Sequence, residues 1–146
     1  MSSITEMLGS KVMDRTGELV SANMLTDTGK VVGLYFSSSW CPDIAFTPFL
    51  ANFFSHFRTT DRGQHFEIVY VSADKDKDAF EQYFGEMPWH AIPYDDLQTR
   101  VRTVIKFDPL HQRMAEDDDE IMHSQPQLYC MTGHYKTFLT LTLLVS

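Results

Sequence analysis

The chain has 146 residues, of which 43% are hydrophobic and 13% aromatic, and its net charge is −8 at neutral pH. This is the length of one domain, and the apolar content is too high for a chain that stays disordered. An acidic protein with a pI near 5.0 lacks the basic surface that binding to nucleic acid or to an anionic membrane requires. We therefore expect a single soluble domain over residues 1–146.

Neither an export signal nor a membrane span is predicted. Residues 1–19 lack the apolar segment of a secretory signal, and no stretch approaches the roughly 20 apolar residues of a membrane span. The chain has two cysteines, Cys41 and Cys130, and both are expected to be free thiols in a reducing compartment. The expected location is the cytoplasm, with the nucleus as the alternative.

The first predicted elements are strands. Residues 11–14 and 19–21 flank a connection that contains Gly17, which predicts a β-hairpin at the leading edge of a sheet. The run 31–36 (VVGLYF) is apolar and rich in β-formers, and it predicts a buried strand. The run 66–72 (FEIVYVS) predicts a second buried strand of the same kind.

Helices are predicted after both strands. Pro42 suits the first position of one helix, and 74–84 forms a second, whose alternating charges at 74–78 indicate a solvated start without a metal site. Strand, helix and strand in this order predict a parallel pair, and hence an α/β fold. A third helix is predicted from Leu97. The apolar positions that support the three helices are Ala45, Phe46, Phe49, Leu50, Phe53, Phe54 and Phe57; Phe80, Tyr83 and Phe84; and Leu97, Val101, Val104 and Ile105.

Cys41 is predicted to lie where the first buried strand turns into the first helix. The positive end of the helix dipole and the free backbone N–H groups there stabilise a thiolate, the nucleophilic form of cysteine. Asp43 has the opposite effect, because a nearby carboxylate raises the pKa of a thiol. A second cysteine at position 44 would resolve a mixed disulfide, but Ile44 stands there. Two interpretations stay open: a redox-competent thiol, or a buried cysteine that only packs.

Three segments, VGLYFSSSWCPDIAFTP (32–48), FEIVYVSA (66–73) and FEQYFGEMPWHAIPY (80–94), resemble nucleoredoxins and tryparedoxins in the family's order. The resemblance implies a thioredoxin-like fold, with a central mixed sheet flanked by helices, and thiol–disulfide exchange. It matches Cys41 to the attacking cysteine, and Trp40 and Pro42 to substrate-binding neighbours. The sequence departs from the family at Ile44, in the place of the resolving cysteine, and at Ala45, in the place of a basic residue.

The C-terminal part departs further from the family pattern. Residues 108–124 contain the acidic run 116–120, which predicts a solvated loop insertion and lacks the ligand spacing of a calcium loop. Residues 125–131 and 135–145 then predict a terminal hairpin, because apolar residues alternate in the last segment. Cys130 is expected to be a buried strand residue.

This hairpin would close the fold without a terminal helix. By the resemblance, Pro126 matches the cis-proline that faces the reactive cysteine and shapes the substrate groove. Without the helix one apolar sheet face would be partly uncovered, and a homodimer or another partner could cover it. The alternative is that residues 107–146 diverge from the thioredoxin-like fold.

The predicted activity, if Cys41 is reactive, is monothiol exchange. The substrate would be a disulfide-containing or glutathionylated protein, and an external reducing thiol would resolve the mixed disulfide. No cofactor, metal, nucleic acid or membrane is expected to take part. The competing hypothesis is a redox-inactive binding or signalling module on the same fold. A peroxidase reaction through a sulfenic acid at Cys41 is a weaker alternative. His90 is expected to have a packing or surface role and not a catalytic one.

Overall fold

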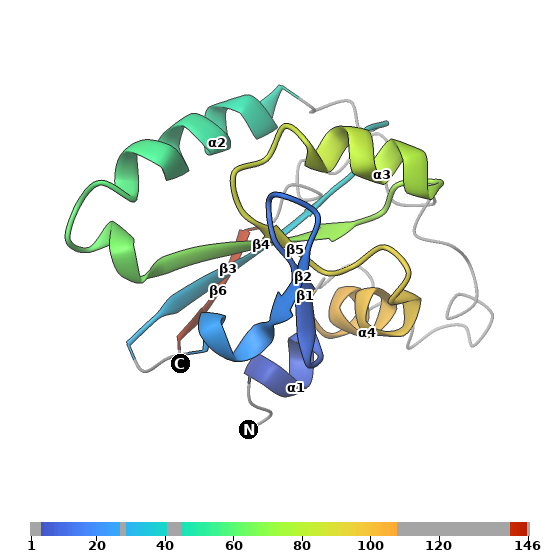
Figure 1. The fold of residues 1–146 in the computed structure, drawn as a ribbon, viewed down its shortest axis with the longest axis horizontal. Helices are drawn as coiled ribbons and strands as arrows, with labels where there is room; N and C mark the ends of the chain where they lie inside the picture. The colour runs from blue at the N-terminus through green and yellow to red at the C-terminus, as the bar shows by residue number, and fades with distance from the viewer. Residues whose placement is uncertain (1–3, 27–28, 41–44, 108–140, 146) are drawn as a thin grey trace.

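A computed structural model describes residues 4–26, 29–40, 45–107 and 141–145, with helices packed around a central sheet (Figure 1). The elements are α1 (Ile4–Leu8), β1 (Lys11–Met13), β2 (Leu19–Ser21), a 3-10 turn (Ala22–Leu25), β3 (Val31–Ser37), α2 (Phe46–Phe57), a 3-10 turn (Gly63–His65), β4 (Phe66–Ser72), α3 (Lys77–Phe84), β5 (His90–Ala91), α4 (Leu97–Phe107) and β6 (Leu141–Val145).

The strands form one mixed sheet in the order β2-β1-β5-β4-β3-β6. β4 is parallel to both β3 and β5, whereas β1 with β2, β1 with β5, and β3 with β6 are antiparallel pairs. β3 and β4 are in register from the pair Val31 and Phe66 to the pair Ser37 and Ser72. The two central strands therefore end level with each other, and the parallel pair predicted from the sequence is confirmed.

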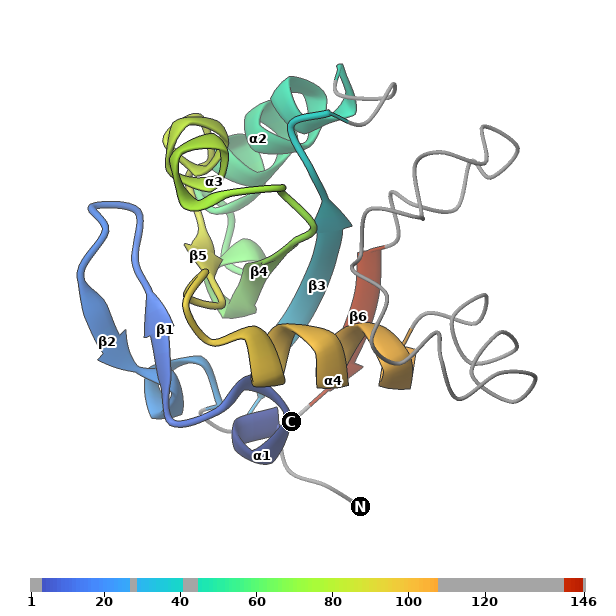
Figure 2. The ribbon, with the colours of Figure 1, turned by 90° about the vertical axis from the view of Figure 1, so that its right-hand side faces the viewer.

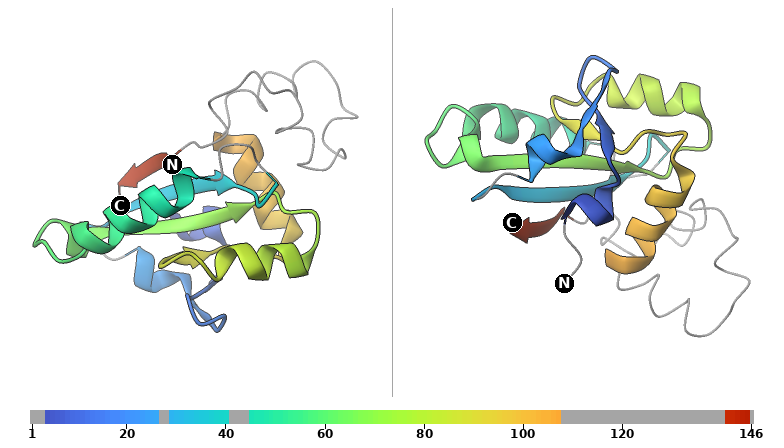
Figure 3. Two further views of the ribbon diagram at one scale, coloured as in Figure 1. Left: turned by 90° about the horizontal axis from the view of Figure 1, so that it is seen from above. Right: turned by 60° about the horizontal axis from the view of Figure 1, so that its bottom comes forward.

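The side chains of β3 and β4 alternate between two cores. α2 and α3 lie on one face of the sheet, and α1 and α4 lie on the other (Figures 2 and 3). Successive strand residues point to opposite faces, so a strand buried on both faces is apolar throughout. One core contains Ile4, Leu8, Val32, Leu34, Phe36, Val69, Val71 and Val104, and the other contains Tyr35, Leu50, Phe54, Ile68, Tyr70, Phe80, Tyr83 and Phe84.

The N-terminal hairpin is confirmed, and β2 forms one edge of the sheet. Asp14 organises its turn: Oδ1 accepts hydrogen bonds from the Thr16 N–H (2.8 Å), the Thr16 hydroxyl (2.6 Å) and the Glu18 N–H (3.0 Å). The bond from the Thr16 hydroxyl is the main reason that the pKa of Asp14 lies below its ordinary value. Gly17 has φ +89°, a conformation that glycine adopts at little cost.

The helix predicted over 74–84 begins later than expected, at Lys77. Asp76 is extended and caps the helix, because its Oδ1 accepts a hydrogen bond from the Ala79 N–H at 2.8 Å. Residues 74–76 are therefore not helical. The predicted anchors of this helix, Phe80, Tyr83 and Phe84, are buried as expected.

α4 begins at Leu97 as predicted, but its apolar pattern does not identify the buried face. Leu97 is 54% exposed, whereas Thr99, Arg100 and Thr103 are buried together with Val104. The Thr103 hydroxyl donates a hydrogen bond to the Thr99 carbonyl oxygen in the same helix, at 2.7 Å. Polar residues can face the core here because their hydrogen bonds are made locally or to the backbone.

α2 also presents aromatic residues on both of its sides. Thr47, Leu50 and Phe54 are buried against the sheet, but Phe49 and Phe53 are 68% and 49% exposed. The apolar series predicted from the sequence is therefore wider than the face that the core covers.

Residues 141–145 form a strand, as the alternation of apolar residues predicts. β6 pairs with β3 from Tyr35 and Leu141 to Val31 and Val145, and it forms the second edge of the described sheet. The other predicted features of the tail lie outside the described residues. These are the loop 108–124, the strand 125–131, Pro126 and Cys130. In the part of the chain that the structure describes, no helix has the length and apolar character needed to cross a membrane.

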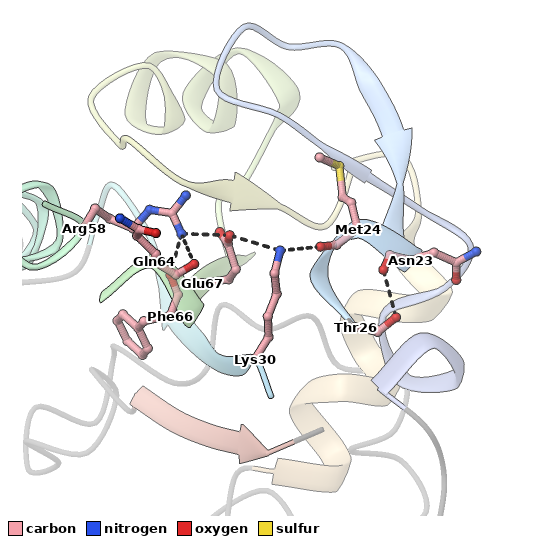
Figure 4. Close-up of polar contacts among 8 residues, drawn as sticks. All are labelled: Asn23, Met24, Thr26, Lys30, Arg58, Gln64, Phe66 and Glu67. Carbon is pink, nitrogen blue, oxygen red and sulfur yellow. Dashed lines mark hydrogen bonds and ion pairs between the residues drawn. The ribbon is translucent and has the colours of Figure 1, made fainter. Parts of the chain in front are cut away.

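The buried acid Glu67 lies at the start of the central strands and forms ion pairs with two basic residues (Figure 4). Glu67 Oε1 lies 2.9 Å from Arg58 Nη1 and 3.7 Å from Lys30 Nζ. Arg58 also donates to the Phe66 carbonyl oxygen at 3.0 Å, and Lys30 donates to the Met24 carbonyl oxygen at 2.7 Å. This cluster joins the segments that enter β3 and β4 to the end of α2.

Candidate functional site

The described residues that precede Cys41 in the sequence, Ser39 and Trp40, lie just after the end of β3 and contact the segment that follows β4. Trp40 is described, whereas Cys41, Pro42 and Ile44 lie outside the described residues, so their roles stay predictions. In the sequence, Cys41 directly follows Trp40. The chain is described again from Ala45, immediately before α2.

Trp40 is half-buried and anchored to the end of the neighbouring strand. Its indole Nε1–H donates a hydrogen bond to the Ala73 carbonyl oxygen at 3.0 Å. The Lys75 ammonium nitrogen lies 5.5 Å from the centroid of the indole ring, within the range of a cation–π contact. The residue before Cys41 is thus attached to the segment that follows β4.

Asp74 is the central acid of the site, and the prediction that it belongs to a solvated helix start is wrong. It is only 5% exposed. Its Oδ1 accepts a hydrogen bond from the Ser39 N–H at 2.7 Å, and its Oδ2 accepts from the hydroxyls of Tyr70 and Ser72, both at 2.6 Å. The Asp74 N–H in turn donates to the Ser72 hydroxyl oxygen at 2.9 Å. The carboxylate therefore holds the loop that leads to Cys41.

Tyr70 supplies one of these hydrogen bonds from inside the core. Burial, followed by the nearby charge of Asp74, raises its pKa well above 10. The phenol therefore stays protonated and remains a donor. It lies 2.6 Å from Asp74 Oδ2 and 3.2 Å from the Ser37 carbonyl oxygen, so the carboxylate receives the stronger bond.

A chain of hydroxyl groups ties α2 and α3 to β3. The Tyr35 hydroxyl lies 2.6 Å from Thr47 Oγ1, the Thr47 and Tyr83 hydroxyls contact each other, and the Tyr83 hydroxyl lies 3.2 Å from Ser37 Oγ. Burial raises the pKa of Tyr35 to about 12, which keeps this phenol neutral. Because Thr47 is in the first turn of α2, the chain of hydroxyls fixes where the helix begins relative to β3.

Arg100 supports the end of β4 from the other face. It is 4% exposed, and it donates from Nη1 to the Ser72 carbonyl oxygen and from Nε to the Tyr94 carbonyl oxygen, both at 3.1 Å. Its guanidinium carbon lies 4.2 Å from the centroid of the Tyr94 ring. Burial lowers the pKa of Arg100, but from a value so high that the group stays charged.

His90 lies away from this edge. It pairs with Val69 in the middle of β4, and burial lowers its pKa from the ordinary value. Its Nδ1 is buried and has no hydrogen-bond partner among the described residues. Within the same described part of the chain, no three His, Cys, Asp or Glu side chains come together as a metal site.

Comparison with known proteins places this arrangement in a family. The family model described as thioredoxin-like matches residues 29–108, which include β3, α2, β4, α3, β5 and α4. The chain belongs to the thioredoxin-like family.

The similar thioredoxin-like proteins include nucleoredoxins and tryparedoxins, so the resemblance seen in the sequence is confirmed. Bovine nucleoredoxin (Bos taurus) is 40% identical over 98 residues, which cover 66% of this chain and 22% of that protein. Tryparedoxin of Trypanosoma brucei brucei is 36% identical over 102 residues, covering 68% of this chain and 67% of that one. The chain thus matches about a fifth of the length of the nucleoredoxin.

A solved structure of tryparedoxin II in complex with glutathionylspermidine shares the fold. Its TM-score is 0.62 at 29% identity, and the match covers 74% of each chain. The predicted thioredoxin-like α/β fold, with a mixed sheet flanked by helices, is therefore confirmed.

Three residues of this site were not predicted from the sequence. Asp74 and Tyr70 help to hold the segment that contains Trp40, and Arg100 supports the end of β4. One signal could have found Asp74: it follows the end of a strand predicted to lie parallel to the strand that precedes Cys41. The carboxyl ends of adjacent parallel strands meet at one edge of the sheet, where α/β folds place their binding sites.

Proposed function

We propose that this protein carries out thiol–disulfide exchange through Cys41 as a single attacking thiol. The observation that carries the proposal is the anchoring of Ser39 and Trp40 to Asp74 and Ala73, directly before Cys41. A nucleophile needs a defined position relative to its substrate, and a rigid neighbouring segment provides it. The nucleoredoxin and tryparedoxin relatives support the same chemistry.

The reaction would proceed in two exchange steps. The Cys41 thiolate attacks one sulfur of a substrate disulfide, so that a Cys41–S bond forms, the substrate S–S bond breaks, and the other sulfur leaves as a thiolate that takes up a proton. The thiolate of an external thiol then attacks the mixed disulfide and releases Cys41. The external thiol ends in a disulfide and is the reductant, because Ile44 cannot take the part of a second cysteine.

The substrate class that we propose is a disulfide-containing or glutathionylated protein, with a glutathione-type thiol as reductant. The tryparedoxin II complex supports this proposal, since that protein binds a glutathione derivative. Free thiols require a reducing compartment, so we propose the cytoplasm or the nucleus as its location.

The test is the alkylation rate of Cys41 as a function of pH, with each modified cysteine located by mass spectrometry and Cys130 as the internal reference. We expect a midpoint below the free-thiol value of about 8.5. Reduction of a glutathionylated peptide should be lost in Cys41→Ser and kept in Cys130→Ser. A Cys41 that titrates at or above the free-thiol value, without exchange, would establish the redox-inactive binding module instead.

A gain-of-function variant sharpens the test. Ile44→Cys supplies a thiol three residues after Cys41, and we expect it to form an intramolecular disulfide and to reduce a protein disulfide without an external resolving thiol. The matched control is Ile44→Cys combined with Cys41→Ser, which should do neither.

A further inference from the structure

α2 lies on the outside of the molecule (Figure 1) and presents aromatic rings to solvent. Phe49 and Phe53 are 68% and 49% exposed. Phe46, which is half-buried, contacts Phe49 with 5.9 Å between the ring centroids. Phe57, also half-buried, stacks on Phe53 with 5.5 Å between the centroids. These four residues, one pair near each end of the helix, form the aromatic face of α2.

The helix that carries the aromatic face has no acidic residue, lysine or arginine among its 12 residues, and its one titratable side chain is that of His56. The other helices that the structure describes each expose charged residues: Glu6 on α1, Lys77, Asp78 and Glu81 on α3, and Arg102 on α4. The chain as a whole has a net charge of −8, so two copies repel each other on most approaches. Among the described helices, α2 is the one through which two copies can meet without setting like charges against each other.

The spacing of the aromatic face is nearly the same in both directions along the helix. Its rings are at positions 46, 49, 53 and 57, so the intervals are three, four and four residues. A two-fold contact places one surface patch against its own copy, and the patch must therefore be complementary to itself. When a second α2 packs antiparallel, the aromatic pair at one end of the first helix meets the pair at the other end of the second. An unrelated partner would not require this match, so the spacing favours a second copy of the chain.

The size of this surface is that of a weak interface. A buried aromatic side chain removes about 150–250 Å² from solvent, so Phe49 and Phe53 together still offer roughly 200 Å² per copy at their exposures. Standard interfaces bury about 800 Å² per partner, around a centre that is poor in charged residues and rich in aromatic ones. The aromatic face has the composition of such a centre, and the remaining area must come from the other exposed residues of α2, which are Pro48, Asn52, Ser55 and His56. We therefore expect association in the micromolar range.

We propose that the aromatic face of α2 is the interface of a homodimer, in which the α2 helices of two copies pack antiparallel about a two-fold axis. Phe49 of one copy lies against Phe53 of the other, and Phe46 lies against Phe57. The interface is a helix face, and it is distinct from the uncovered sheet face for which the sequence suggested a homodimer or another partner. It does not depend on the exchange proposed for Cys41, and a redox-inactive module could form the same dimer.

Sedimentation equilibrium of the full chain tests the interface, in a reducing buffer that prevents disulfides between copies. From roughly 1 to 500 µM, wild type should pass from monomer to dimer. Phe53→Ala should raise the dissociation constant about tenfold, the scale of an aromatic residue at the centre of an interface. Phe49→Glu should abolish the dimer over this range, because it sets an unpaired charge against apolar rings. Leu97→Glu is the matched control, since it adds the same charge at a leucine of α4 that is 54% exposed, and it should keep the dimer.

A pair of complementary variants tests the antiparallel packing. Phe49→Lys and Phe53→Glu should each be monomeric alone. Mixed in equal amounts, they should form a heterodimer, because position 49 of one copy faces position 53 of the other and the opposite charges attract. A mixture of Phe49→Lys and Phe49→Glu is the control, and it should associate less, since these positions do not face each other. Association in the control mixture alone would mean parallel packing and would overturn the proposed arrangement.

Two results would overturn the interface itself. The first is a wild type that stays monomeric over the whole range. In that case a loss of stability to urea in Phe49→Glu indicates that another segment of the same chain covers α2, and unchanged stability leaves the face to a different protein. The second is a dimer that persists in both Phe49→Glu and Phe53→Ala, because its interface then lies elsewhere. Neither result bears on the exchange proposed for Cys41, which the alkylation rate and Cys41→Ser test separately.

Discussion

β4 carries a buried acid near each of its ends, and the two acids are satisfied in different ways. Glu67, near the start of the strand, contacts the cations Arg58 and Lys30 (Figure 4). Asp74, just after the end of the strand, accepts hydrogen bonds from neutral groups, two hydroxyls and one backbone N–H. Of the cations that the structure describes, none forms an ion pair with Asp74.

The difference distinguishes the end of the sheet where Glu67 has a structural role from the end that precedes the proposed Cys41 site. The cations on Glu67 neutralise its charge and join the segments around the strand starts. The donors on Asp74 leave its negative charge in place and fix the backbone of Ser39, next to Trp40. A change at Glu67 should therefore act on stability alone, and a change at Asp74 should act on both stability and the reactivity of Cys41.

Asp74→Ala should have the largest effect. It leaves the hydroxyls of Tyr70 and Ser72 and the Ser39 N–H without their acceptor, and we expect the free energy of unfolding to fall by about 3 kcal/mol. Urea unfolding measures this loss. Trp89 is 1% exposed, so acrylamide quenching reports on Trp40 and should increase in the variant.

Asp74→Asn is the matched control, since an amide oxygen can replace one carboxylate oxygen in nearly the same space. We expect it to restore part of the stability and to keep Trp40 protected, while the alkylation rate of Cys41 still changes because the charge is gone. Quenching of Trp40 that is equal in wild type and Asp74→Ala would refute the anchoring role.

Glu67→Ala should be the next most damaging change. Removing one partner of a buried ion pair costs roughly 3–5 kcal/mol when the other charge stays buried. The side chains of Arg58 and Lys30 are 38% and 21% exposed, so both can regain water. We therefore expect a loss of about 2 kcal/mol in urea unfolding. A changed alkylation rate at Cys41 in this variant would contradict the expectation that Glu67 affects stability alone.

Tyr83→Phe should cost about 1 kcal/mol, because Ser37 and Thr47 both lose the Tyr83 hydroxyl while Thr47 keeps the hydroxyl of Tyr35. Urea unfolding measures this smaller change. Since the substitution loosens α2 from β3, we also expect Cys41 to be alkylated at an altered rate. Tyr94→Phe is the control, because among the described residues the Tyr94 hydroxyl makes only a long hydrogen bond of 3.4 Å, to the Asp74 carbonyl oxygen. Equal losses from the two substitutions would argue against the hydroxyl chain.

The smallest predicted effect is a pH dependence through His90. Burial lowers its pKa in the folded protein, with Glu67 and Asp14 acting in the opposite direction and Arg58 and Lys30 in the same one. The unfolded chain therefore binds a proton first, at about pH 6.5, and stability falls as the pH drops from there through the folded-state pKa. Urea unfolding between pH 5 and 7.5 should show this fall in wild type and a flatter profile in His90→Gln. An identical profile in the variant would remove His90 as its cause.

The parts of the fold that the sequence predicts well are those with a strong local pattern. The hairpin around Gly17 and the two central strands follow from turn residues and continuous β-forming runs, and the resemblance in three segments identifies the family. The start of α3 was predicted too early, because the charges of residues 74–76 suit a helix terminus as well as the extended segment that leads into it.

The predictions fail where a residue's neighbours come from distant parts of the chain. The apolar positions of α4 suggest that Leu97 is buried, yet Arg100 faces the core because carbonyl groups after β4 and on the Tyr94 segment accept its hydrogen bonds. Phe49 and Phe53 of α2 look like core residues in the sequence, but the sheet covers only the side of the helix that carries Leu50 and Phe54.

The order of residues is enough to identify the family, the two buried strands, the place of Cys41 between a strand and a helix in the chain, and the absence of a thiol at position 44. These depend on residue order and local periodicity, which are properties of the chain alone. The burial of Asp74 beneath the segment of Ser39 and Trp40, and the position of Lys75 over the indole ring, become visible only in the folded chain. Both facts depend on β3 and β4 ending level in the sheet, which brings together residues that are more than thirty positions apart in the chain.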